Sequence, residues 1–286
     1  MSTRFSTLAR AVSVSGIGLH SGDSVNVRLL PRELHEDQSA IIFARTDLPG
    51  APEVPASWRC IGSTHHATTL QSESVFIGTP EHLLAALWSL GISHCRIELD
   101  AIEVPILDGS SQVWCELIER AGRRELDGAR PEYSLRAPVA VYAREGAVIA
   151  LPHPSLHVTT DVEYGVAYLP SQVFGTTVTP QVFQSEIASA RTFTLESWIE
   201  PLRASGLIRG GNEENALVLR ENAPSSALRF ETELARHKAL DLLGDIALLF
   251  GENGGILNAH LIAIRAGHEL HRLWMEAAMK SGALHL

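Results

Sequence analysis

Several features that mark particular protein classes are scarce or missing in this chain of 286 residues. Its three cysteines, Cys60, Cys95 and Cys115, are widely spaced and include no CxxC pair, so the sequence predicts neither a disulfide framework nor a thiolate metal site. No run approaches the ~18 apolar residues of a membrane-spanning helix, and the N-terminus lacks the continuous apolar core of a signal peptide. We therefore expect a cytoplasmic protein without a transmembrane segment.

Positive charge is also in short supply. The chain has 23 Lys and Arg against 33 Asp and Glu, a net charge of −10, and no run rich in basic residues. This balance argues against binding nucleic acid through a basic surface, although a small anionic substrate needs only a few local cations. Hydrophobic residues make up 45% and charged residues 20% of the chain, as in ordinary globular proteins.

What is present is a segregated pattern of strands and helices in two halves. The first half has a helix between Thr79, which we predict as its cap, and Gly91, and a second helix from about Ser110 to Ala121. The second half has a long helix from about Ser226 to Phe250 and a last one after Gly267. The predicted strands share β-branched residues between turn signals; they lie at 24–31, 40–48, 95–106, 138–145, 147–152, 156–165 and 256–267.

This segregation favours an α+β fold over a doubly wound parallel sheet. The stretch 123–138, "RRELDGARPEYSLRAP", is polar and rich in turn formers, which predicts a linker between the halves. We expect two similar domains, residues 1–124 and 131–286, each a β-sheet layer packed on α-helices.

The long helix carries an unusual polar stripe in the stretch 236–245, "RHKALDLLGD". His237, Asp241 and Asp245 recur every fourth residue on one face, which Phe230 and Leu234 share, while apolar residues cover the other faces. A buried charge is costly unless it is paired or bound to a metal. Two interpretations fit. His237 could be a core histidine that hydrogen-bonds Asp241, or the two residues, four positions apart, could both be zinc ligands.

A zinc site needs a third ligand, and the best candidate is His82 in the first turn of the helix that follows Thr79. Its neighbour Glu81 could then take a proton from the attacking water. The alternative is a solvated glutamate favoured by the helix dipole. Because His82 and His237 lie in different halves, a shared metal would place the site at the domain interface.

A further histidine, His268, follows Gly267 at a strand-to-helix junction, where a general acid could reach a leaving group. Asp245, one step further along the polar stripe, could orient an imidazole through a hydrogen bond. Taken alone, His268 is a weak signal.

Taken together, several segments between about residues 4 and 279 resemble the UDP-3-O-acyl-N-acetylglucosamine deacetylases, zinc enzymes of bacterial lipid A synthesis. Each short segment is weak by itself, but their order along the chain is specific. The segments are "SGIGLHSGDSVNVRLLP", "TPEHLLAALWSLGISHCRIEL", "EVPILDGSSQVWCELI", "ARTF", "GLIRGGNEENALVL", "LRFETELARHKALDLLGD" and "AGHEL".

The resemblance implies hydrolysis of the acetamide of a UDP-linked acylated amino sugar, with release of acetate. It implies zinc as cofactor, with the ligands His82, His237 and Asp241. It also implies a role for each remaining site residue: Glu81 as base, His268 as general acid, Asp245 as support of His268, Thr192 as a hydroxyl at the oxyanion, and Lys238 as a cation contacting substrate.

The family fold implies a small insert in each domain, and the second insert would span about 190–219 as a strand, a helix and a strand. In the family this insert forms an apolar passage for the acyl chain. The residues at matching positions are Phe193, Ile199, Gly211, Ala216 and Val218. Without the resemblance, the same stretch is typical of an ordinary βα unit with its own core.

Some residues depart from the family pattern. His65 and His66 stand where small or apolar residues are usual; on a strand at most one of them could face the site. His271 and Arg272 replace asparagines, and the role of His20 is open.

Two rival hypotheses remain, a non-catalytic paralogue that binds a nucleotide sugar and a zinc amidase for a different acylated sugar. We expect a monomer.

Overall fold

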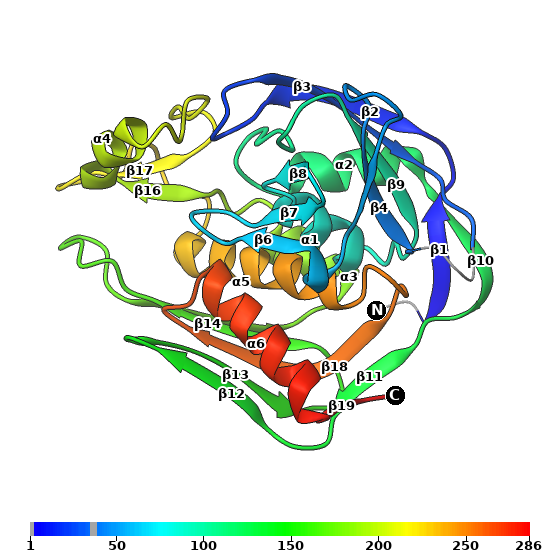
Figure 1. Ribbon diagram of the computed structural model, residues 1–286. Coiled ribbons are helices and arrows are strands. Elements are labelled where there is room, and N and C mark those ends of the chain that lie inside the picture. The colour runs from blue at the N-terminus through cyan, green and yellow to red at the C-terminus, as the bar shows by residue number, and fades with distance from the viewer. Residues whose placement is uncertain (1–2, 35–38) are drawn as a thin grey trace.

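The computed structural model describes residues 3–34 and 39–286. Two large sheets enclose a central layer of helices, and a small strand-helix-strand unit projects from one side (Figure 1). The predicted α+β class is therefore confirmed. Within the described ranges, no helix has the length and apolar character needed to cross a membrane.

The first large sheet comes from the N-terminal part of the chain. Its five strands run in the order β2-β3-β9-β4-β5, and only the β4–β9 pair is parallel. The strands are β2 (Val12–Ile17), β3 (Ser24–Leu30), β4 (Ile41–Arg45), β5 (Glu53–Pro55) and β9 (Cys95–Leu99).

The second large sheet comes from the C-terminal part and has seven strands. Its longest strand, β18 (Ile256–Ile264), pairs with β13, β14 and β11, and it runs parallel to the last two. The other strands are β11 (Glu132–Leu135), β12 (Val139–Ala143), β13 (Gly146–Pro152), β14 (His157–Val162), β15 (Gln172–Thr177) and β19 (Leu284–His285).

Three small sheets complete the strand pairing of the described residues. One pairs the start of the chain with its middle, β1 (Arg4–Leu8) with β10 (Arg123–Ala129). The second consists of β6 (Ile61–Ser63), β7 (Thr69–Ser72) and β8 (Val75–Gly78). The third is the parallel pair β16 (Phe193–Leu195) and β17 (Leu217–Leu219) of the projecting unit.

The helices of the central layer are apolar on nearly every side. All nine residues of α1 (Glu81–Ser89) are buried, and α5 (Glu233–Ile246) is buried along most of its length. A helix buried all round must lie between other elements. The remaining helices are α2 (Gln112–Ala121), α3 (Pro180–Val182), α4 (Glu196–Ala204) and α6 (His268–Ser281), with short turns at Trp58–Cys60, Phe183–Ile187 and Ala247–Leu249.

The predicted start of the long helix is wrong. Helix α5 begins at Glu233, seven residues after the predicted Ser226, and Phe230 lies in the preceding loop rather than on the helix. The Glu233 carboxylate accepts a hydrogen bond from the backbone N–H of Arg229, and its own N–H donates to the carbonyl of Phe230. This local bonding begins the helix at Glu233, because the backbone before it is bonded in a turn.

The predicted cap of α1 is also wrong. Thr79 has a positive φ of 54°, and its hydroxyl donates to Glu103 at 2.9 Å instead of capping the helix. Helix α2 begins two residues later than expected, at Gln112. The stretch predicted as a linker contains β10 and β11, whose partners β1 and β18 lie in the N-terminal and C-terminal parts of the chain. Strand β10 ends at Ala129, and β11 begins at Glu132.

Candidate active site

The polar stripe of α5 meets the first turn of α1 in the centre of the molecule. His82 Nε2 lies 3.5 Å and His237 Nε2 lies 3.3 Å from the same oxygen, Asp241 Oδ1. All three residues are at most 5% exposed. The structure thus brings together the two helices that the sequence nominated from different halves of the chain.

A glycine allows this approach of the two helices. A Cβ atom built on Gly244 of α5 would stand 2.1 Å from the backbone oxygen of Glu81, closer than any real contact. Only glycine therefore lets α5 pass the start of α1 at this distance. The consequence is that Glu81 and His82 face the stripe of α5 directly.

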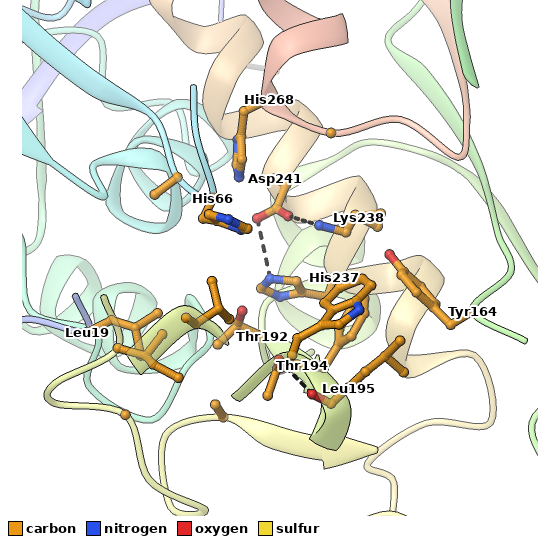
Figure 2. A pocket seen from close by; sticks show the side chains of 18 of the residues that line it. Leu19, His66, Tyr164, Thr192, Thr194, Leu195, His237, Lys238, Asp241 and His268 are labelled. Atoms are coloured by element: carbon orange, nitrogen blue, oxygen red, sulfur yellow. Dashed lines mark hydrogen bonds and ion pairs between the residues drawn. The ribbon is translucent and has the colours of Figure 1, made fainter. Parts of the chain in front are cut away.

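The donor atoms of this cluster suit a metal ion. His82, His237 and Asp241 offer ligand atoms that all lie within 4.8 Å of one another. His237 Nδ1 donates to the Ala190 carbonyl at 3.0 Å, which leaves Nε2 with its lone pair toward Asp241 (Figure 2). Burial lowers the pKa of His237 to about 4, so the ring is neutral at pH 7. Two imidazoles and a carboxylate are a common divalent-metal set.

Lys238 neutralises the other oxygen of the shared carboxylate. Its Nζ lies 2.8 Å from Asp241 Oδ2 and over the ring of Phe193 at 5.4 Å. Burial alone would raise the pKa of Asp241, but the neighbouring His237 and the Lys238 ammonium hold it well below its usual range. The Asp241 carboxylate is therefore ionised at neutral pH and can offer an anionic oxygen to a metal ion.

Glu81 has the character of a general base. It is 3% exposed, and burial raises its pKa to about 7. Its Oε1 accepts a long hydrogen bond from the Thr68 N–H at 3.4 Å, whereas Oε2 has no hydrogen-bond partner among the described residues. A buried carboxylate with a free oxygen and a pKa near neutrality can take up a proton.

A second carboxylate, Asp245, holds the first turn of α6. Its Oδ2 accepts hydrogen bonds from His268 Nδ1 and His271 Nδ1, both at 2.7 Å, and its Oδ1 accepts one from the Thr68 hydroxyl at 2.6 Å. Burial lowers the pKa of His268, but Asp245 outweighs it and raises the pKa to about 10. His268 is thus a cation at neutral pH, with Nε2 3.7 Å from Glu81.

The cluster opens into a cavity of about 1210 Å³. Figure 2 shows side chains of the cavity wall, with Asp241 and His237 turned to the same space as His268 and Thr192. Asp245, which is bonded to His268, is not one of the residues that line this cavity. The lining includes the other site residues that the sequence nominated: Glu81, His82, Thr192, Phe193, Ile199, Gly211, Ala216, Val218, His237, Lys238, Asp241 and His268.

The projecting unit forms the apolar part of the wall. It contains β16, α4 and β17, a strand, a helix and a strand in that order. Thr192 connects it to the body, because its N–H donates to the Gly109 carbonyl and its carbonyl accepts from the Leu217 N–H. Gly109 has a φ of +82°, and a Cβ there would stand 2.1 Å from the Asn215 oxygen, so this junction needs glycine.

The histidines with open roles fall into different places. His66 lines the cavity and His65 does not, although the reason differs from the prediction: both follow β6 in a loop, and His66 has a φ of 66°. His20 lines the cavity, and both of its ring nitrogens are buried without a partner among the described residues. Arg272 points away to Glu269 and Glu276.

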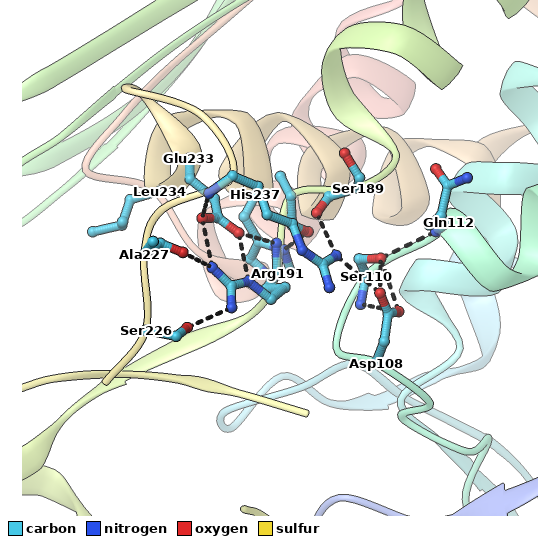
Figure 3. Close-up of polar contacts among 12 residues, drawn as sticks. Asp108, Ser110, Gln112, Ser189, Arg191, Ser226, Ala227, Glu233, Leu234 and His237 are labelled. Carbon is cyan, nitrogen blue, oxygen red and sulfur yellow. Dashed lines mark hydrogen bonds and ion pairs between the residues drawn. The ribbon is translucent and has the colours of Figure 1, made fainter. Parts of the chain in front are cut away.

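Sequence reasoning missed a buried ion pair behind the site. Arg191 donates through its guanidinium and backbone N–H to Glu233, which is fully buried (Figure 3). The same guanidinium reaches the Ser226 hydroxyl and the Ala227 carbonyl. The pair fixes the segment that carries the Ala190 carbonyl and Thr192 against α5. Arg191 stands inside "ARTF", but nothing in its spacing indicates a partner 42 residues away.

Thr68 was missed as well. Its hydroxyl bonds Asp245 and its backbone N–H bonds Glu81, so it contacts both carboxylates outside the metal set. Tyr164 also lines the cavity, and burial raises the pKa of its hydroxyl. Both are isolated polar residues in strand-like stretches, which carry no periodic signal.

The sequence is similar to proteins with a common name. Residues 5–280 match the model of the LpxC family, described as UDP-3-O-acyl N-acetylglycosamine deacetylase. The chain is 41% identical to a protein of Solibacter usitatus over 93% of this chain and 88% of that protein, and 41% identical to one of Thermosynechococcus vestitus over 93% and 90%. A Myxococcus xanthus protein is 36% identical over 93% and 84%. All three are named UDP-3-O-acyl-N-acetylglucosamine deacetylase.

Proposed function

The chain belongs to the LpxC family of deacetylases of lipid A synthesis, and on this premise we propose which of its residues carry out each part of the reaction. The substrate is UDP-3-O-acyl-N-acetylglucosamine, and the products are acetate and the free amine of the sugar. The main support for this proposal is that His82, His237 and Asp241 lie together beside Glu81 and His268 in one cavity.

His82, His237 and Asp241 would hold the metal, for which we propose Zn²⁺. When bound, zinc supplies a Lewis acid that polarises the acetamide carbonyl and makes a water molecule more acidic. The three side chains fit this ion because two imidazole nitrogens and one carboxylate oxygen lie within 4.8 Å of one another. The hydrogen bond from His237 to the Ala190 carbonyl fixes the required tautomer.

Glu81 is the proposed general base. Its free Oε2 is positioned to take a proton from the water that attacks the carbonyl carbon. A pKa of about 7 lets the carboxylate be ionised before attack and hold the proton afterwards. The Thr192 hydroxyl, on the same cavity wall, would donate to the oxygen of the tetrahedral intermediate.

His268 is the proposed general acid. Its Nδ1–H is bonded to Asp245, so the proton on Nε2 is the one available to the departing sugar nitrogen. Because Asp245 raises the pKa of His268 to about 10, the ring carries this proton throughout the neutral range. Asp245 is therefore a positioning residue that also stabilises the charge.

Lys238 and the projecting unit would bind the rest of the substrate. Lys238 places an ammonium at the cavity wall beside the reacting centre, where it can contact an anionic or polar substrate group. The wall around Phe193, Ile199 and Val218 is apolar, as an acyl chain requires. We propose that residues of about 190–219 form the acyl passage.

The first test couples metal analysis to acetate release. The purified protein should bind one zinc and release acetate from UDP-3-O-acyl-N-acetylglucosamine. Glu81→Gln should lower kcat by about 10²-fold or more, because the base is lost, while one zinc stays bound. His237→Ala is the matched control in which the zinc itself should be lost. Absence of acetate release by the zinc-loaded protein would refute the proposal.

The remaining expectations need separate measurements. Turnover on substrates with different acyl lengths distinguishes this enzyme from an amidase for another acylated sugar. The presence of every reacting side chain in one cavity argues against the non-catalytic alternative. We also propose two domains, residues 1–124 and 131–286, a monomeric state and a cytoplasmic location. Limited proteolysis would test the domain limits, size-exclusion chromatography the monomeric state and cell fractionation the location.

A further inference from the structure

Three histidines gather on the outer face of the second large sheet. His157 of β14 and His260 of β18 are direct neighbours in the strand register, and His153 follows the end of β13. Their ring centres are 4.6 Å (His157 to His260), 5.7 Å (His153 to His157) and 6.1 Å (His153 to His260) apart. All three side chains are partly exposed.

This cluster is separate from the active site. Along β18, Leu257, Ala259 and Leu261 are buried toward the helices, whereas His260 alternates with them and points to the other face. Side chains on a strand alternate between the two faces of the sheet. The histidine cluster therefore lies on the side of the sheet opposite α5.

The ring spacing is that of imidazoles around one metal ion. With Zn–N bonds of about 2.0–2.1 Å, ring centres stand about 3 Å from the metal, so two rings at a tetrahedral angle are about 5 Å apart. The three distances in the cluster bracket this value. In the active site of the same molecule, the His82 and His237 rings are 5.0 Å apart.

Each ring is also held by one of its nitrogens. His153 Nδ1 bonds the Ser155 carbonyl at 2.8 Å. His157 Nδ1 bonds the Thr177 hydroxyl at 3.1 Å, and His260 Nε2 bonds the Thr159 hydroxyl at 2.9 Å. The second nitrogen of each ring makes no hydrogen bond to a residue of the described ranges. One bonded nitrogen and one free nitrogen is the usual state of a metal-ligating histidine.

We propose that His153, His157 and His260 form a surface site for a late first-row divalent cation, such as Zn²⁺, Ni²⁺ or Cu²⁺. Such ions favour imidazole ligands. The three nitrogens do not yet lie within 4.8 Å of one another. Metal binding would require the rings to turn about their broad Cβ–Cγ torsions. Water completes the coordination.

The test uses protein whose active site is already loaded with one zinc. Titration with Ni²⁺ in a non-chelating buffer should show one further bound equivalent. Cu²⁺ should broaden the backbone amide signals of β14 and β18 in NMR spectra, which locates the second ion independently of activity. His157→Gln and His260→Gln should each weaken this second equivalent at least about tenfold, because one of three ligands is lost. Acetate release should stay unchanged.

His285→Gln is the matched control, since it removes a histidine outside the cluster and should leave the second equivalent in place. The proposal is overturned if no second equivalent binds below about 1 mM free Ni²⁺. It is equally overturned if Cu²⁺ broadens the β14 and β18 amides alike in wild type and in both variants. Neither result depends on the proposed deacetylase mechanism.

Discussion

The buried polar centre and the projecting unit line the same cavity, and they are built in different ways. The centre uses side chains of α1, α5 and α6 that are almost fully buried and bonded to one another. The projecting unit has two three-residue strands and a helix, α4, that buries none of its residues completely. The proposed reacting groups thus lie on buried inner helices, and the apolar wall lies on a small unit whose helix is mostly exposed.

This difference predicts a division of labour. A change in the polar centre should lower kcat for every substrate, because it alters the reacting groups. A change in the projecting unit should alter KM according to the acyl chain, because it alters only binding remote from the reaction. Substitutions in each region, and in the ion pair that joins them, test whether the two regions affect kcat and KM separately.

The largest effect is expected from Asp245→Asn. The amide cannot serve as an anionic acceptor for both His268 and His271, so the orientation and charge of the proposed acid are lost. Loss of a carboxylate that orients a catalytic imidazole costs about 10²- to 10⁴-fold in kcat. Steady-state kinetics with substrates of two acyl lengths should show the same loss for both.

The same variant should also change the pH dependence of kcat. Asp245 raises the pKa of His268 to about 10, against the effect of burial. Without the carboxylate this pKa falls, so His268 loses its proton at a lower pH. The decrease of kcat on the alkaline side of the pH profile should therefore begin at a lower pH. An unchanged alkaline limb would contradict the role of His268. Asp127→Asn, on the exposed strand β10, is the control.

A loss of stability is expected from Glu233→Gln, which breaks the ion pair between the two regions. It leaves Arg191 buried without its charged partner, and such losses cost about 3–5 kcal/mol. Burial would raise the pKa of Glu233, but the bonds from Arg191 lower it below the usual 4.5. The carboxylate therefore stabilises the fold above this value and loses its effect as the pH falls through the folded pKa.

Urea unfolding at pH 7 and at pH 4 measures both parts of this prediction. The difference between wild type and Glu233→Gln should be largest at pH 7 and should shrink in acid. Glu200→Gln changes an exposed carboxylate on α4 and should leave the free energy of unfolding almost unchanged. Equal losses in the two variants would show that the buried pair does not join the regions.

The polar centre could be foreseen because its residues follow a period. His237, Asp241 and Asp245 recur every fourth residue in an apolar helix, and this stripe alone required a partner such as His82. The Arg191–Glu233 pair and Thr68 could not be foreseen, because they join residues whose separation is set by tertiary packing. The start of α5 was misplaced for the same reason, since Glu233 makes its bonds to a loop.

The smallest effect is expected from Ala216→Leu in the projecting unit. Ala216 lines the apolar wall, and a leucine there fills space that a long acyl chain would occupy. KM for a long-chain substrate should rise about tenfold, while kcat and the KM for a short-chain substrate stay the same. Ala204→Leu, at the exposed end of α4, adds the same volume outside the cavity and should change neither. A fall in kcat for both substrates would mean that the wall is coupled to the reacting groups, and the division between the two regions would not hold.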